Sequence, residues 1–295
     1  MTKPSLSQIW LMAIRPKTLA AAVSPVLMGT AMAFGDGVYH FPSAFFCLIG
    51  ALLIQIGTNL ANDYYDFLKG VDNTQRTGPV RVTQVGYLKP QTVKWAYVAS
   101  FVAAGLVSLY LINRAGWPIA LIAISAVLSG IFYTAGKNPL GYRGFGEVFV
   151  FLFFGPIAVA GTYYVQSFEI NFAVILAGVA PGLLSTAILT VNNLRDISSD
   201  KQSSKKTLAV RFGKSFAKSE YALCLFISLM VPVMIYLLTF DHAYILLASL
   251  LLFLTVSLLK IVLGESSGTE LNKVLAKTSQ LLLIYSLVFS LGWVL

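Results

Sequence analysis

Two segments of the chain carry the residue types that bind divalent cations. They read "NLANDYYDFLKGVD" (59–72) and "TVNNLRDISSD" (190–200). In each, an asparagine precedes an aspartate by four residues and a second aspartate follows, which singles out Asn62, Asp66, Asp72, Asn192, Asp196 and Asp200. Residues four apart lie on one face of a helix. Carboxylate and amide oxygens suit Mg²⁺, which usually shares its shell with substrate phosphates. Asp63 is a further candidate ligand.

Each acidic segment runs into a basic stretch with a similar ending, "GPVRVTQVG" (78–86) or "KKTLAVRFG" (205–213). Lys and Arg are the usual partners of phosphate oxygens. The cations available for this role are Lys69, Arg76, Arg81, Lys201, Lys205, Lys206 and Arg211. Any one of them could instead be a solvated or snorkelling charge at a helix end. Two matching segments together favour a shared diphosphate–metal site, at the interface of two related helical sub-bundles.

The elements that position these residues are predicted to be transmembrane helices. The chain of 295 residues is 57% hydrophobic and 11% charged, whereas about a quarter of a soluble domain is charged. Long apolar stretches recur, and each can cross a ~30 Å hydrocarbon core as a helix. We expect an all-α polytopic membrane bundle that forms a single domain over 1–295, with nine helices near 18–35, 42–68, 91–112, 116–136, 146–165, 170–193, 218–239, 242–262 and 274–295.

The distribution of positive charge predicts the orientation of the bundle. With the N-terminus inside, all Lys and Arg residues except Arg114 fall in inner segments or at their helix-end margins, as the positive-inside rule requires. The protein is therefore expected to be a multi-pass protein of the cytoplasmic (inner) membrane, with its N-terminus and active-site loops cytoplasmic. Topology and the lipid bilayer explain the net charge of +9, so no nucleic-acid partner is expected.

A transporter is the alternative from a different class, because repeats and intramembrane polar groups also mark transporters. A transporter usually carries charged groups near the middle of the bilayer. Here nearly all the charge lies at one face, which favours an enzyme.

Three segments resemble the UbiA superfamily of intramembrane prenyltransferases: "IRPKTLAAAVSPVLMG" (14–29), "NDYYDFLKGVDNTQRTGPVRVTQ" (62–84) and "NPLGYRGFGE" (138–147). The resemblance covers essentially the whole chain. It implies a nine-helix fold with Mg²⁺ and a polyprenyl diphosphate at the ends of helices 2 and 6. The last two segments resemble the menaquinone branch, which implies prenylation of 1,4-dihydroxy-2-naphthoate with loss of CO₂ and diphosphate to give demethylmenaquinone. Another aromatic acid, such as 4-hydroxybenzoate, is the alternative acceptor.

The resemblance also implies roles for individual residues. Asn62, Asp66 and Asp72 would form the first metal and diphosphate motif, although Asp72 follows Asp66 by six residues instead of the usual four. Asp196 and Asp200 would form the second motif. Tyr133 and Lys137 match a catalytic Tyr–Lys pair of the superfamily.

Chemistry adds two expectations. Tyr64, Tyr65 and Tyr133 could stabilise an allylic cation through their ring faces. Arg143 could bind the acceptor carboxylate, with Lys137 as second choice; alternatively, Arg143 only pairs with Glu147.

Overall fold

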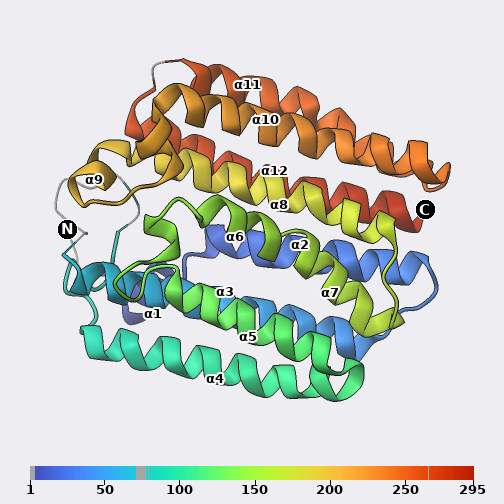
Figure 1. Ribbon diagram of the computed structural model, residues 1–295, viewed down its shortest axis with the longest axis horizontal. Helices are drawn as coiled ribbons and strands as arrows, with labels where there is room; N and C mark the ends of the chain where they lie inside the picture. The colour runs from blue at the N-terminus through green and yellow to red at the C-terminus, as the bar shows by residue number, and fades with distance from the viewer. Residues whose placement is uncertain (1–3, 71–77, 79, 265) are drawn as a thin grey trace.

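The computed structural model describes residues 4–70, 78, 80–264 and 266–295, and within these it contains helices and no strands. The helices lie roughly along the long axis of the molecule, with α9 and the N-terminus at one end and the C-terminus at the other (Figure 1). In chain order they are α1 (Leu6–Ile14), α2 (Pro16–Gly35), α3 (Phe41–Leu68), α4 (Pro90–Ala115), α5 (Trp117–Phe132), η1 (Leu140–Tyr142), α6 (Gly146–Phe153), α7 (Pro156–Ser167), α8 (Phe172–Arg195), α9 (Ile197–Gln202), α10 (Leu208–Thr239), η2 (Ala243–Leu251), α11 (Leu252–Leu263) and α12 (Gly268–Val294).

The predicted all-α membrane bundle is confirmed. Within the described ranges, eight helical segments are long and apolar enough to cross a bilayer, counting α6–α7 and η2–α11 as one each. The remaining predicted span, 116–136, which is the fourth along the chain, is the shorter helix α5, which has 16 residues. The helix ends at Phe132. The chain beyond it turns at Gly136, whose φ of +82° favours glycine.

The N-terminal helix α1 was not predicted. Ser5 and Gln8 form a capping box at its start. Ile9 and Ala13 are buried while Leu6, Leu11 and Met12 are exposed, so α1 has the apolar surface of a helix that lies at a membrane interface. It ends at Arg15, whose φ of 53° turns the chain into α2.

The predicted span 146–165 is broken between α6 and α7. At the break, a Cβ atom on Gly155 would lie 2.6 Å from the carbonyl oxygen of Gly178 in α8. Glycine therefore allows the backbone of the break to pack directly against α8, and Pro156 begins α7 in a position where proline is favourable.

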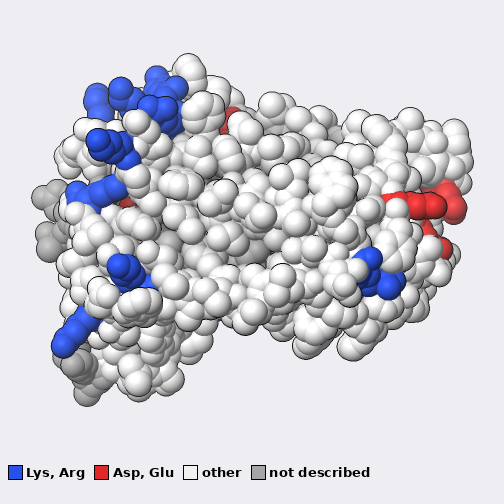
Figure 2. Space-filling view, turned by 60° about the horizontal axis from the view of Figure 1, so that its bottom comes forward, with Lys and Arg blue, Asp and Glu red and all other residues white. Residues whose placement is uncertain are grey.

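Charge is concentrated at the two ends of the bundle. Figure 2 shows Lys and Arg gathered at the end that carries α9, a broad uncharged middle, and acidic side chains at the opposite end. Asp36, Glu169 and Asp241 are the acidic residues that the sequence places at that far end, beside Arg114. An uncharged belt between polar ends is the pattern of a multi-pass membrane protein.

Candidate active site

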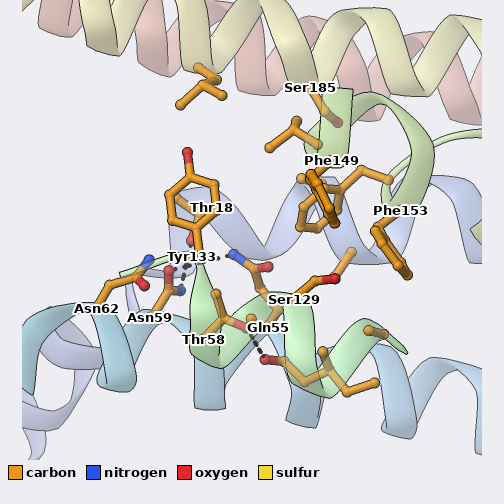
Figure 3. A pocket seen from close by; sticks show the side chains of 18 of the residues that line it. Thr18, Gln55, Thr58, Asn59, Asn62, Ser129, Tyr133, Phe149, Phe153 and Ser185 are labelled. Carbon is orange, nitrogen blue, oxygen red and sulfur yellow. Dashed lines mark hydrogen bonds between the residues drawn. The ribbon is translucent and has the colours of Figure 1, made fainter. Parts of the chain in front are cut away.

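A cavity of about 440 Å³ runs inside the bundle between α2, α3, α5, α6, α7 and α8. Cys47 and Asp66 both line it and both lie on α3. At 1.5 Å per residue they are about 29 Å apart, nearly the thickness of a bilayer core. One end is polar and holds the aspartate segments, while the remainder is mostly apolar. Figure 3 shows Phe149 and Phe153 of α6 facing this space across from α3 and α5.

Asp66 is the centre of the polar end. Its side chain is 2% exposed, so its charge needs partners within the protein. Arg81 Nη2 donates to Oδ2 at 2.8 Å, and the Tyr142 hydroxyl donates to Oδ1 at 2.7 Å. Lys205 Nζ lies 3.7 Å from Oδ1. Asn62, four residues earlier, lines the same cavity, and its Oδ1 accepts a bond from Thr134.

The second aspartate segment faces the first across the cavity. Arg195 donates to both oxygens of Asp196, at 2.7 and 2.6 Å. Arg195 also donates to Asn192 Oδ1 at 2.7 Å. Asp200 lies one turn later, and its Oδ1 is 4.0 Å from Lys205 Nζ. Asn192, Asp196 and Asp200 all line the cavity.

Lys205 connects the two segments, because its ammonium group approaches both Asp66 and Asp200. A cation therefore already occupies the space between the two carboxylates. Among the described residues, no three His, Cys, Asp or Glu side chains group closely enough to hold a metal ion alone. Mg²⁺ is usually held by one or two carboxylates together with substrate phosphates. The carboxylate and amide oxygens at this end therefore fit Mg²⁺ whose remaining ligands come from substrate phosphates.

Asp63 lies outside the cavity lining, although it neighbours Asn62. Its Oδ2 accepts a 3.2 Å bond from the backbone of Val82, and its Oδ1 accepts a bond from the Thr83 hydroxyl. Asp63 therefore holds the segment that carries Arg81 against α3. Its carboxylate is engaged by that segment and does not face Asp196 or Asp200.

The remaining predicted residues divide between the cavity and the surface. Arg81 and Tyr133 line the cavity, and Figure 3 shows Tyr133 among its lining side chains. Five predicted cations have exposed side chains that do not line it: Lys137, Arg143, Lys201, Lys206 and Arg211. Arg211 instead fixes the loops by donating to the carbonyl oxygens of Lys206 and Arg143. Asp72 and Arg76 lie outside the described residues.

The family is decided by comparison with known sequences. The pattern of the UbiA prenyltransferase family matches residues 22–286, most of the chain. The chain belongs to this family. Its resemblance to the menaquinone branch is also confirmed. The 1,4-dihydroxy-2-naphthoate octaprenyltransferase of Escherichia coli is 36% identical over 299 aligned positions, covering 98% of this chain and 96% of that protein. The protein of the same name from Mycobacterium tuberculosis is 40% identical over 213 positions, 72% of each chain.

A solved structure supports the UbiA fold. A UbiA homolog from Archaeoglobus fulgidus, bound to GPP and Mg²⁺, superposes with a TM-score of 0.68 over 96% of this chain and 99% of that one. The two sequences are 17% identical. At that identity the likeness concerns the fold alone.

Several cavity residues of this UbiA family member were missed by the sequence reasoning. Arg15, Thr18, Gln55 and Asn59 line the polar end together. Asn59 donates to Ile14 O and to Thr18 Oγ1, both at 2.9 Å, which ties α3 to the α1–α2 junction. Figure 3 shows Asn59 and Gln55 beside Tyr133. The "IRPKTL" segment stands out in the sequence only through its resemblance, and its closeness to Asn59 has no local sequence signal.

The tyrosines expected to stabilise a cation are separated by the fold. Tyr64 and Tyr65 pack against Tyr97 of α4, and the hydroxyls of Tyr65 and Tyr97 lie 3.2 Å apart. Neither lines the cavity, whereas Tyr133 does. Tyr142 was also missed: Lys69 and Lys205 each lie 4.7 Å from the centre of its ring.

Lys69 belongs to the same polar end of the UbiA bundle. Burial lowers the pKa of Lys69, the nearby Asp66 raises it, and Lys205 lowers it further. Lys69 also donates to the carbonyl oxygen of Thr134. Lys69 and Lys205 lie over the same Tyr142 ring, so two ammonium groups are available to an anion at the polar end.

Proposed function

We propose that this protein is a Mg²⁺-dependent aromatic polyprenyltransferase. It would transfer a polyprenyl group from polyprenyl diphosphate to 1,4-dihydroxy-2-naphthoate, releasing CO₂ and diphosphate and giving demethylmenaquinone. The observation that carries the proposal is the cavity that joins both aspartate segments to a long apolar channel. The names of its relatives from Escherichia coli and Mycobacterium tuberculosis support the choice of acceptor.

The cavity suits a lipid with a doubly charged head. The prenyl tail would lie along apolar side chains such as Phe149, Phe153 and Ile157, with its diphosphate at the polar end. Asp66, Asp196 and Asp200, with the amide oxygens of Asn62 and Asn192, would hold Mg²⁺. Bound Mg²⁺ would neutralise the negative charge that develops on diphosphate as the allylic C–O bond breaks.

Arg81 and Lys205 are the chain's own groups that would act on the leaving diphosphate. Both line the cavity beside Asp66, and both can donate to phosphate oxygens. Tyr133 lines the same cavity and would present its ring to the allylic cation, a contact worth ~1–2 kcal/mol when desolvated. The enclosing helices would keep water away from that cation until the acceptor carbon attacks.

The acceptor carboxylate needs a different cation from the two suggested by sequence. Arg143 and Lys137 are exposed and do not line the cavity, whereas Arg15 does. The Asn59 and Thr18 contacts fix the backbone at Ile14 and Arg15, which holds this arginine at the cavity. We therefore assign the acceptor carboxylate to Arg15.

Arg15→Ala is expected to raise the apparent KM for 1,4-dihydroxy-2-naphthoate at least about tenfold, because a charge-assisted contact contributes about 1.5–3 kcal/mol. The KM for polyprenyl diphosphate should change much less. Arg143→Ala, which removes an exposed arginine from the same face, is the matched control and should leave both constants within about threefold. The assay uses membranes, labelled polyprenyl diphosphate and a panel of aromatic acids. Equal use of 4-hydroxybenzoate by the wild type, or a product that keeps its carboxylate, would contradict the proposed acceptor.

The active-site end is proposed to face the cytoplasm in the inner membrane. Cysteines introduced at Asn138 and Gln202, both exposed, should then react only with a reagent that reaches the inner face. A cysteine at the exposed Glu169 should react only from outside. The unsubstituted protein, whose Cys47 and Cys224 lie in the bundle, reports background labelling. Labelling of position 202 from outside would reverse the proposed orientation.

A further inference from the structure

Glu147 is a buried acid to which the proposed reaction assigns no role. It is the last residue of the "NPLGYRGFGE" segment and lies in the first turn of α6 with 5% exposure. It does not pair with Arg143. Instead, its Oε1 accepts a 2.8 Å bond from Asn193 Nδ2, across to α8. Burying a carboxyl group in a membrane protein is costly, so such a group usually has a polar partner like this one.

The bond to Glu147 fixes the orientation of the Asn193 amide. An asparagine side chain donates only through Nδ2 and accepts only through Oδ1. Since Glu147 Oε1 accepts the bond, the Asn193 amide is held in the orientation in which Nδ2 points towards Glu147. Asn193 lines the cavity, and within the described residues no hydrogen bond is formed to its Oδ1. This cavity-lining side chain therefore keeps an oxygen that can accept a further hydrogen bond.

Asn193 lines the cavity on the same helix as Asp196. Asn193 precedes Asp196 by three residues on α8, a rise of about 4.5 Å. Tyr133 and Leu189 line the cavity as well, and a Cβ atom on Gly146 would lie 2.8 Å from the Tyr133 hydroxyl and 3.3 Å from Leu189 Cδ2. Gly146 thus allows the start of α6 to pack against the cavity wall, which brings Glu147 to Asn193.

We propose that Asn193 Oδ1 accepts a hydrogen bond from a ring hydroxyl of the acceptor, and that Glu147 is a positioning residue that holds the amide in this orientation. The inference rests on the proposed aromatic prenyl transfer and adds a basis for acceptor specificity. A hydroxyl that donates to a fixed acceptor is oriented beside the allylic carbon. An acceptor without that donor leaves the buried oxygen unsatisfied, which is how such sites reject analogues.

The experiment compares 1,4-dihydroxy-2-naphthoate with its two mono-methyl ethers, each of which lacks one donor. In the wild type, one ether should lose at least about 30-fold in kcat/KM relative to the parent. Glu147→Gln keeps the size of the side chain but can both donate and accept, so the Asn193 amide is no longer fixed. The loss for that ether should then fall below about fivefold, with the KM for polyprenyl diphosphate unchanged.

A paired exchange separates this role from simple packing. In the double variant Glu147→Gln/Asn193→Asp, the amide introduced at position 147 donates to the carboxylate introduced at position 193, and the other oxygen of that carboxylate again faces the cavity. Discrimination between the parent and the ether should return to at least half of its wild-type value on a logarithmic scale. Thermal unfolding in detergent checks that each variant is folded. If the double variant is not folded, the discrimination measured with Glu147→Gln alone tests the inference.

Unchanged discrimination in folded Glu147→Gln would overturn the inference, as would a folded double variant that discriminates no better than Glu147→Gln. Neither outcome affects the proposed function, which fails if the wild type does not prenylate the dihydroxynaphthoate. In that case the same comparison is made with the methyl ether of whichever hydroxylated acid it uses.

Discussion

Asp66→Asn is expected to lower turnover at saturating substrate by at least two to three orders of magnitude, on the order of the loss seen when one charge-stabilising group is removed from an active site. Asp66 is the carboxylate that meets Arg81, Tyr142 and Lys205 at one point. The amide keeps the shape of the side chain but removes the charge that would hold Mg²⁺. The measurement is the initial rate of the purified protein with both substrates in excess.

The Asp66 variant also has an expected cost in stability, because it breaks the buried ion pair between Asp66 and Arg81. Breaking a buried ion pair typically costs about 3–5 kcal/mol. The double variant Asp66→Asn/Arg81→Gln should recover most of the thermal stability and none of the activity. Asp241→Asn, at the opposite end and largely exposed, is the control and should match the wild type. A folded Asp66→Asn protein that keeps more than a tenth of wild-type turnover would rule out the assigned role.

Removal of divalent cations is expected to have the second large effect, a loss of at least about a thousandfold in turnover. Without a divalent ion, Arg81 pairs with Asp66, and Lys205 approaches both Asp66 and Asp200. These two positive charges balance only the two carboxylates, so they leave no charge to balance a diphosphate. The test is the rate after exhaustive chelation, followed by titration with Mg²⁺.

Addition of Mg²⁺ should restore the rate, and Ca²⁺ should restore it poorly, since Ca²⁺ prefers a larger and less regular oxygen shell. The same chelator treatment of the Arg143→Ala protein controls for effects on the detergent-solubilised bundle. Full turnover by chelated wild-type protein would contradict the proposed metal dependence.

The membrane bundle could be predicted from sequence because a bilayer restricts the alternatives. Only helices and closed barrels satisfy backbone hydrogen bonds in lipid, and the long apolar stretches select helices. The four-residue spacing of Asn62 and Asp66 likewise placed both on one helix face, and both line the cavity. Both inferences depend only on residues that are close together in the chain, so the sequence is sufficient to make them.

Residues whose roles depend on distant partners could not be predicted in this way. Asp63 is one position from Asn62, yet a rotation of about 100° per residue turns it towards Val82 and Thr83 instead of the cavity. Arg143 has the right charge, but the turn at Gly144, with φ of +73°, leaves its side chain exposed. Pairing of Glu147 with Arg143, four residues back, was one of the alternatives, whereas Glu147 instead accepts a bond from Asn193 on another helix.

The pairing of charges in this molecule also bears on how it is made by the ribosome. Asp66 has Arg81 as a counter-ion only 15 residues later, and Asp196 has its immediate neighbour Arg195. Asp66 and Asp196 therefore each have a counter-ion in their own half of the chain, which is available before the other half is needed. Lys205 reaches Asp66 only after the second half has been made, so these two carboxylates are paired even before the halves pack together.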